Sequence, residues 1–379
     1  MASGVLRLPP LPTIRDLIKL YRISARKQLS QNFLMDENLT SKIIKQAGHL
    51  TNGHVIEVGP GPGGLTRAVL RKMPKKLIVV EKDKRFNPTL KMLGEAFSNA
   101  GGQMNIISDD ILRTNFDKMI DEKEKVRWEA RCPNITVIGN LPFSVSTHLI
   151  IRWLESISRH EGLWSFGRTR LLLTFQKEVA ERLVAPVKNC QRCRLSVMAQ
   201  AWTQPKLRFL IPGTAFVPKP KVDVGVVSFI PLITPRTTHD FKLFEKVTRH
   251  VFSFRRKFSI KGVATLFPPE NREELSIVMF KIADVDPQAR PYELSVEDIH
   301  RLCSSYKYLR EKHPSISDYE YRASKKIMSR KYLQNVEVVE FDDYADDELE
   351  ESNDRADTEI NEQSIENPLC TLNSPSTID

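Results

Sequence analysis

Short apolar runs and longer amphipathic segments alternate along residues 41–229, an order typical of an α/β protein. The runs are rich in β-branched side chains and are bounded by glycine, proline or polar residues. This pattern predicts strands at residues 55–58, 77–80, 104–107, 135–138, 171–175 and 225–229, and helices at 41–47, 65–70, 144–157 and 176–183. We therefore expect an open α/β sheet with buried parallel strands.

The periodicity becomes helical after a proline-bounded linker at residues 231–235. Helices are predicted at 241–252, 274–283 and 296–306. These helices form a small all-helical domain of ordinary size. The domains expected from the pattern are 27–232 for the α/β part and 236–335 for the helical part.

Residues 1–12 are apolar and proline-rich, and residues 1–26 as a whole form a basic amphipathic segment. A helix is predicted to begin at Thr13, with Asp16 as its capping partner, and arginines and lysines flank its apolar face. A basic amphipathic start with one acid is typical of a mitochondrial transit signal. We favour that interpretation over an ordinary first helix packed on the domain.

The net charge of +10 conceals two oppositely charged parts. Residues 337–379 hold fifteen Asp and Glu and one Arg, a net charge of −14, so residues 1–336 carry +24. Because residues 1–336 are so basic, we expect this part of the chain to bind polyanions, with an affinity that depends on salt. The acidic tail is poor in core residues, and we expect it to be disordered.

The five cysteines are scattered, as is typical of reduced thiols rather than a disulfide framework. Cys190 and Cys193 are the one close pair, and without a second pair or matching histidines they do not complete a zinc site. No metal is therefore expected. No stretch approaches the roughly 20 apolar residues of a membrane helix, so no membrane association is expected.

A glycine-rich turn at residues 59–64 joins the strand at 55–58 to the following helix. A strand, glycine turn and helix bring the backbone close to a nucleotide, although the glycines alone do not separate NAD from S-adenosylmethionine. Glu81 ends the second strand, where an acid is placed to hold ribose hydroxyls. A surface acid paired with Lys82 is the alternative.

Two further segments are candidates for contact with a cofactor. Asp110 and Ile111 follow the third strand, where an acid can accept from an adenine amine and an apolar side chain can pack on the ring. A helix cap is the alternative interpretation of Asp110. In the segment 27–34, polar amides flank a bulky apolar pair and could close over a cofactor, or form a plain loop.

The motif Gly139-Asn140-Leu141-Pro142-Phe143 follows the strand at 135–138, where open α/β sheets bind their ligands. Asn140 supplies a carbonyl that accepts from an amine, and Pro142 holds the backbone so that the Leu141 carbonyl can be aimed. Phe143 offers a flat face for a base. The motif predicts a site for adenine N6. A strand-ending turn with Phe143 in the core is the alternative.

Basic residues in two segments are candidates for nucleic-acid contact. In the loop 216–224, Lys219 and Lys221 alternate with prolines, which suits a rigid loop resting on a phosphate backbone. The other segment interleaves Arg255, Arg256 and Lys257 with Phe252, Phe254 and Phe258. We expect these cations to contact nucleic acid and these phenylalanines to lie in the core. A solvated loop and a solvated basic face are the alternatives.

Several motifs, taken together and in this order, resemble the ribosomal RNA adenine dimethyltransferases, a family of bacterial small-subunit enzymes with nuclear and mitochondrial relatives. The motifs are QNFL (31–34), EVGPGPGGLT (57–66), VVEKD (79–83), SDDIL (108–112), GNLPFSVST (139–147), TFQKEVAERL (174–183) and FVPKPKVDVGVV (216–227). Phe143, where many relatives have tyrosine, and VPKPKVD look like the mitochondrial branch. The resemblance runs from about residue 27 to about residue 305, and the acidic tail departs from it.

This resemblance implies a Rossmann-like class I methyltransferase domain that uses S-adenosylmethionine, followed by the helical domain and the tail. The implied reaction is N6-dimethylation of two adjacent adenosines in a hairpin loop near the 3′ end of small-subunit ribosomal RNA. The implied enzyme is a monomer of the mitochondrial matrix that acts on the assembling small ribosomal subunit. The mitochondrial transcription machinery is a further expected partner.

The resemblance also implies a role for each matching site residue. The residues expected to close on the cofactor are Gln31, Asn32, Phe33 and Leu34. Those expected to hold its methionine, ribose and adenine are Glu57, Gly59, Gly61, Gly63, Glu81, Lys82, Asp110 and Ile111. Asn140 is expected to lie between cofactor and target, with Leu141, Pro142 and Phe143 beside it as the catalytic group.

Two rival functions account for parts of the sequence. A non-catalytic ribosome-assembly or transcription factor would retain the fold and the basic surface, but the intact glycine turn, Glu81 and Asn140 argue against lost catalysis. An NAD-dependent dehydrogenase would explain the glycines, but neither the Asn-Leu-Pro-Phe motif nor the basic body.

Overall fold

The computed structural model describes residues 32–114, 116, 119–313, 316, 319 and 321, together with residues 13 and 16. Apart from Thr13 and Asp16, the predicted amino-terminal helix lies outside the described residues, as do Gln31 and the acidic tail. The sheet and the helices that follow it belong to one compact unit. The division into domains 27–232 and 236–335 stays a prediction.

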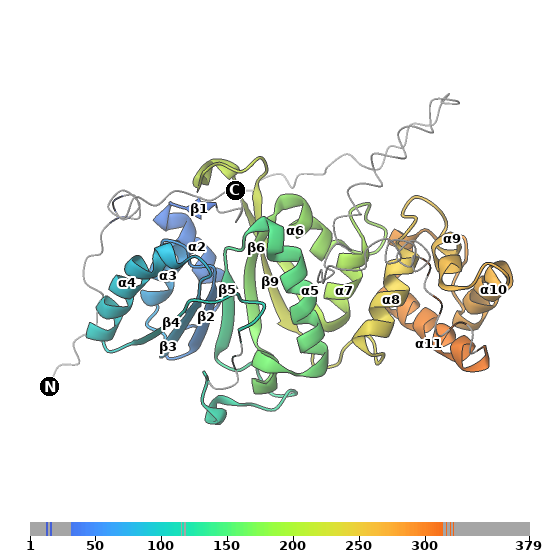
Figure 1. Ribbon diagram of the computed structural model, residues 1–379, viewed down its shortest axis with the longest axis horizontal. Helices are drawn as coiled ribbons and strands as arrows, with labels where there is room; N and C mark the ends of the chain where they lie inside the picture. The colour runs from blue at the N-terminus through green and yellow to red at the C-terminus, as the bar shows by residue number, and fades with distance from the viewer. Residues whose placement is uncertain are drawn as a thin grey trace, which may run out of the picture. The chain divides into compact units, whose positions relative to one another are not determined.

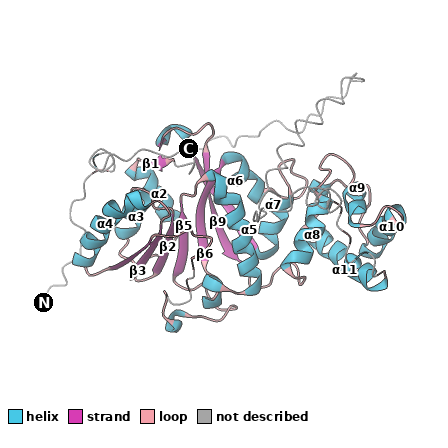
Figure 2. Cartoon of the chain, in the orientation of Figure 1, coloured by secondary structure: helices cyan, strands magenta, loops and turns pink. Residues whose placement is uncertain are grey.

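Seven strands form one sheet in the order β4-β3-β2-β5-β6-β9-β7 (Figures 1 and 2). The first five strands of this order run parallel, and β9 and β7 are antiparallel to their neighbours. The bounds are β2 His54–Val58, β3 Lys76–Val80, β4 Gln103–Ile107, β5 Ile135–Gly139, β6 Arg170–Gln176, β7 Thr203–Ile211 and β9 Val224–Pro231. All six predicted strands are confirmed, with small changes at their ends.

The helices predicted between residues 41 and 306 are also present, and side-chain caps explain why some begin where they do. Asp36 accepts from the backbone amides of Asn38 and Leu39, so α2 begins four residues before its predicted start. The bounds are α2 Glu37–Gln46, α3 Gly64–Leu70, α4 Asn87–Asn99, α5 Phe143–Arg159, α6 Lys177–Val184, α7 Arg194–Trp202, α8 Phe241–Val251, α9 Ser259–Val263, α10 Arg272–Ala283 and α11 Val296–Lys312.

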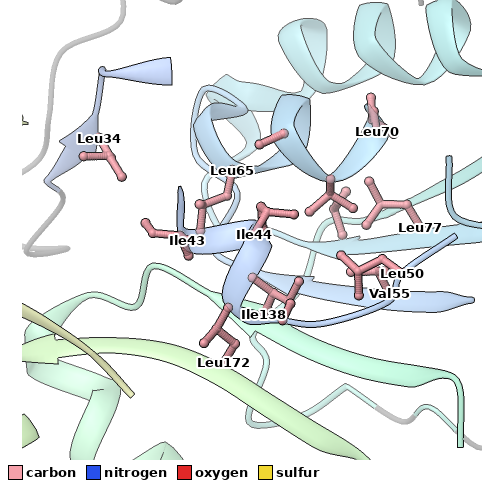
Figure 3. Packing of buried hydrophobic residues seen from close by; sticks show 14 of the residues in the cluster. Leu34, Ile43, Ile44, Leu50, Val55, Leu65, Leu70, Leu77, Ile138 and Leu172 are labelled. Carbon is pink, nitrogen blue, oxygen red and sulfur yellow. The ribbon is translucent and has the colours of Figure 1, made fainter. Parts of the chain in front are cut away.

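One face of the sheet packs against α2 and α3 in a hydrophobic core (Figure 3). Side chains of paired parallel strands point to the same face, so Val55 of β2 lies beside Leu77 of β3 on that face. Ile43 and Ile44 of α2 are buried against this layer. The packing fixes the strands whose carboxyl ends form the site.

The sequence pattern did not predict six of these helices and strands: α4, α7, α9, β7 and the short strands β1 (Phe33–Leu34) and β8 (Phe216–Val217). β7 is an edge strand that contains Pro205 and exposes alternate residues, so it lacks the continuous apolar run of a central strand. β1 pairs antiparallel with β8. In the segment expected to be a lid or a plain loop, Phe33 and Leu34 are therefore paired with the start of the proline-lysine loop.

A buried arginine joins the sheet part to the helical part. Arg192 precedes α7 and is fully buried. Its guanidinium donates to the carbonyls of Ala185 and Leu294 at 3.0 and 3.1 Å, and to Oε1 of Gln200 at 2.8 Å. Breaking these hydrogen bonds would leave a buried guanidinium without its partners, which is energetically costly. The network therefore stabilises the connection between the two parts.

The expectation that Phe252, Phe254 and Phe258 lie in the core is wrong for two of them. Phe254 and Phe258 are 39% and 48% exposed, and Phe252 is half-buried. The core between α8 and the sheet part is filled instead by Trp202, whose ring lies 5.0 Å from that of Phe241. The exposed rings lie in the same segment as the exposed cations Arg256 and Lys257.

No helix in the described part of the chain is long and apolar enough to cross a bilayer. The same residues contain no group of three or more His, Cys, Asp or Glu side chains placed to hold a metal ion.

Candidate active site

A cavity of about 250 Å³ lies at the carboxyl ends of β2, β3 and β5. The strand order reverses between β2 and β5, which is the position where open α/β sheets bind ligands. Of the predicted site residues, those that line it are Asn32, Phe33, Leu34, Glu57, Gly59, Gly61, Glu81, Lys82, Asp110, Ile111, Asn140, Leu141, Pro142 and Phe143. Segments more than a hundred residues apart in sequence therefore meet around one space.

The glycine turn has a backbone that few other residues could adopt. Gly59, Gly61 and Gly63 have φ angles of +65°, +54° and +91°. Gly59 and Gly61 line the cavity, whereas Gly63 is the residue before α3 and does not. A Cβ atom at Gly63 would lie 2.5 Å from Cδ1 of buried Leu93, so this glycine allows close packing beneath the turn.

Glu81 ties the glycine turn to the end of β3. Its Oε2 accepts from the Gly61 amide at 3.0 Å and its Oε1 accepts from the Asp83 amide at 2.8 Å. Burial raises the pKa of this carboxyl, while these two amides oppose the rise. Each carboxylate oxygen can accept more than one hydrogen bond, so Glu81 retains capacity for ligand hydroxyls.

Glu57 places a second carboxyl in the wall of the cavity, at the fourth position of β2. It is 1% exposed, and burial raises its pKa to about 8. The neighbouring Thr66 opposes this rise, and the charge of Glu81 adds to it. Oε2 of Glu57 has no hydrogen-bond partner in the described protein. A cationic or hydroxyl-bearing ligand would satisfy it.

Asp110 and Lys82 form an ion pair of 2.9 Å across the ends of β4 and β3. Asp110 also accepts from the Leu112 amide at 3.0 Å. Burial raises the pKa of Asp110, but the Lys82 ammonium and the Leu112 amide outweigh it, and the net pKa is lowered. The carboxylate therefore stays charged beside Ile111, as recognition of an amine requires.

The carboxamide of Asn140 is fixed by two hydrogen bonds at the end of β5. Its Nδ2 donates to the Asn32 carbonyl at 3.0 Å, and its Oδ1 accepts from the Thr174 hydroxyl at 2.8 Å. Pro142 has φ −57° and precedes α5, which begins at Phe143. The Phe143 ring packs partly on the core and also borders the cavity. Its role in stacking a base stays a prediction.

Sequence reasoning missed several residues at the cavity. Val58, Pro60, Val80, Asp109 and Ser144 line it because each neighbours a predicted residue on a strand end or turn. Thr174 was recognised only as part of a family motif. Its contact with Asn140 joins residues 34 positions apart, which no local pattern reveals.

The predicted RNA-binding residues do not line the cavity. Lys219 and Lys221 are exposed on the loop between β8 and β9. Arg256 and Lys257 are exposed after α8, whereas half-buried Arg255 donates to the Cys190 carbonyl. The hydrogen bond to Cys190 gives Arg255 a structural role. No such side-chain contact is seen for Arg256 or Lys257 among the described residues.

Comparison with known proteins shows the family to which the chain belongs. A family model for "Ribosomal RNA adenine dimethylase" matches residues 22–307. "Dimethyladenosine transferase 1, mitochondrial" from Homo sapiens is 51% identical over 344 residues, covering 90% of this chain and 98% of the relative. The protein of the same name from Drosophila pseudoobscura pseudoobscura is 52% identical over 324 residues, covering 85% and 94%.

Solved structures show the same fold. The crystal structure of a dimethyladenosine transferase from Plasmodium falciparum superposes with a TM-score of 0.58 at 22% identity, covering 73% of this chain and 98% of that chain. The crystal structure of the 23S rRNA methyltransferase ErmE superposes with a TM-score of 0.50 at 19% identity, covering 73% of this chain and 100% of that chain. The α/β sheet is thus that of a class I methyltransferase, and this chain belongs to the ribosomal RNA adenine dimethylase family.

Proposed function

We propose that this chain transfers methyl groups from S-adenosylmethionine to N6 of two adjacent adenosines in the 3′-terminal hairpin loop of mitochondrial small-subunit ribosomal RNA. Family membership supports the reaction, and the names of the animal relatives support a mitochondrial location. We further propose that it acts as a monomer in the matrix on the assembling subunit. The observation that carries the proposal is the fixed Asn140 carboxamide beside a cavity lined with carboxylates.

The residues around the cavity suit the chemistry of S-adenosylmethionine. Glu81 has acceptor capacity for the ribose hydroxyls, and the unpartnered Oε2 of Glu57 suits the positively charged methionine end. Asp110 and Ile111 offer an acceptor and an apolar surface to the adenine, and Phe33 covers the glycine turn. When bound, the cofactor supplies a methyl group on a positively charged sulfur.

The amine of the target adenine is a weak nucleophile because its lone pair is delocalised into the ring. Oδ1 of Asn140 and the carbonyl of Leu141 would accept hydrogen bonds from the two amine hydrogens. These bonds raise the electron density on N6 and fix its direction, so orientation and electrostatics supply most of the rate enhancement. No base is needed before attack, because the proton becomes acidic once N6 is cationic and then leaves to water.

The target base must leave its stack to reach Asn140. The half-buried Phe143 ring borders the cavity and offers a face for that base, worth roughly 1–3 kcal/mol. After the first transfer the amine still carries one hydrogen. One acceptor therefore suffices in the second round, which is consistent with dimethylation of the same nitrogen.

Exposed cations outside the cavity would hold the RNA backbone. We assign this role to Lys219 and Lys221 on the loop after β8, and to Arg256 and Lys257 after α8. The exposed rings of Phe254 and Phe258 lie among the latter cations and can stack on unpaired bases.

The deciding experiment incubates the protein with labelled S-adenosylmethionine and a hairpin RNA that carries two adjacent loop adenosines. Mass spectrometry should find N6,N6-dimethyladenosine at both positions, and a hairpin with guanosines there should remain unmodified. RNA binding without methyl incorporation would instead support a non-catalytic assembly or transcription factor. A thermal shift with NAD but not with S-adenosylmethionine would refute the proposed cofactor.

A further inference from the structure

We infer that Thr174 is a positioning residue for Asn140, and this inference rests on the proposed methyl transfer. Thr174 lies in β6 and is 1% exposed. Its hydroxyl donates to Oδ1 of Asn140 at 2.8 Å, while Nδ2 of the same amide donates to the Asn32 carbonyl at 3.0 Å. The amide is therefore bound on both sides by the protein itself.

The two contacts determine which way the amide faces. A main-chain carbonyl can only accept, so the Asn32 carbonyl requires the NH₂ group on its side. The hydroxyl of Thr174 can donate or accept, and it donates because the carbonyl oxygen of the amide faces it. An amide rotated by 180° would place two acceptors, Oδ1 and the Asn32 carbonyl, against each other.

The position of Thr174 is well determined by the sheet. Gly139 of β5 pairs with Leu173 of β6, so the residues that follow each, Asn140 and Thr174, lie side by side. Thr174 is also paired with Val226 of β9 on its other side. A β-branched side chain has few rotamers, so its hydroxyl is held in one direction.

The arrangement leaves one acceptor position open on Asn140. The Thr174 hydroxyl occupies one of the two lone pairs of Oδ1, and the other remains for the target amine. Donation from Nδ2 to Asn32 also polarises the amide and increases the negative charge on Oδ1. Without Thr174 the amide would rotate more freely, and the acceptor would be aimed correctly for only part of the time.

The test compares Thr174→Val, which keeps the shape but removes the hydroxyl, with Thr174→Ser, which keeps the hydroxyl. Misplaced reacting groups can cost about 100-fold in rate, so we expect Thr174→Val to lower kcat by roughly 10- to 100-fold. The KM for hairpin RNA and the affinity for S-adenosylmethionine should change by less than about threefold, and Thr174→Ser should recover most of kcat.

Thr136 provides a matched control. It is a threonine of β5, also 1% exposed, and its hydroxyl has no hydrogen-bond partner among the residues that the structure describes. Thr136→Val should therefore leave kcat unchanged. If Thr174→Val does not fold, Thr174→Ala replaces it in the same comparison.

Normal kcat in Thr174→Val, a loss confined to KM, or equal losses in the Val and Ser variants would overturn the positioning role. Those outcomes leave the proposed function intact because the unaltered protein still transfers methyl groups. Absence of transfer by the unaltered protein would instead refute the function, and with it the inference.

Discussion

Two hydrogen bonds from within the protein hold the side chain of Asn140 in place. A preorganised acceptor does not need to reorient as charge develops on the target amine, which is why such groups contribute strongly to catalysis. The sequence predicted the residue, because an amide followed by proline at a strand end has an evident use. It did not predict the partners, which come from β6 and from the residue before β1.

We expect Asn140→Ala to lower methyl transfer by at least about 100-fold, because it removes an acceptor that acts on the reacting amine. RNA affinity, measured by filter binding, should stay within about twofold. Asn134→Ala is the control, since that amide donates to the Thr51 carbonyl at the opposite end of the strands. Turnover equal to that of the unaltered protein would exclude Asn140 from the mechanism.

Because the pKa of Glu57 is raised, we expect the stability of the cofactor-free protein to depend on pH. Its pKa is raised from 4.5 to about 8 by burial, so the folded state holds the proton more tightly than the unfolded state. The protonated Glu57 makes its full contribution to the free energy of unfolding below pH 4.5. This contribution falls as the pH rises from 4.5 and is lost at about pH 8. Each unit of pKa shift corresponds to about 1.4 kcal/mol, so several kcal/mol is the upper limit.

Glu57→Gln removes this titration. The Tm of the variant minus that of the unaltered protein should therefore increase between about pH 5 and about pH 8.5, as measured by scanning fluorimetry. A difference that stays constant over this range would show that Glu57 is ionised throughout.

At the scale of elements, the strands that carry the site could be predicted because each is a short apolar run ending at a glycine or polar residue. β2, β3 and β5 illustrate this, and their carboxyl ends all border the cavity. β7 was not predicted because Pro205 interrupts it and its exposed residues alternate with partly buried ones. β1 and β8 are two residues long, and only their pairing with each other defines them.

The turn before α3 gives a prediction that separates backbone strain from packing. An alanine at Gly59 or Gly63 must adopt a positive φ, which costs roughly 1–2 kcal/mol. At Gly63 the added Cβ also meets the fully buried Leu93, which has little room to move, and overpacking adds about 1–3 kcal/mol. At Gly59 the nearest atoms are 3.8 Å away.

Gly63→Ala should therefore lower the free energy of unfolding more than Gly59→Ala, as measured by urea denaturation. Equal losses would mean that Leu93 moves aside and that only the backbone angle matters.

At the scale of the whole molecule, the positive charge of residues 1–336 supplies the long-range attraction to RNA. Composition alone predicted this charge, but not which cations are exposed. Arg255 is engaged with the Cys190 carbonyl, whereas Arg256 and Lys257 are exposed beside two exposed aromatic rings. The negative charge of residues 337–379 lies outside the described part of the chain.

Arg256→Glu combined with Lys257→Glu should weaken binding to the hairpin RNA and make its salt dependence shallower. Each lost phosphate contact lowers the slope of log K against log salt by about 0.7–0.9. Lys72→Glu combined with Lys91→Glu is the charge-matched control, on exposed lysines of the sheet part. If the two double variants gave equal slopes of log K against log salt, the segment containing Arg256 would have no specific role in RNA binding.

The pairing of β1 with β8 has a consequence for how the enzyme would complete two rounds on one nitrogen. Phe33 and Leu34 line the cavity and pair with β8, which leads directly into the loop that carries Lys219 and Lys221. Spent donor must depart between the rounds, and loosening β1 to release it would also disturb the loop that we propose holds the RNA. We therefore expect a distributive enzyme, in which singly modified RNA dissociates and accumulates early in the time course.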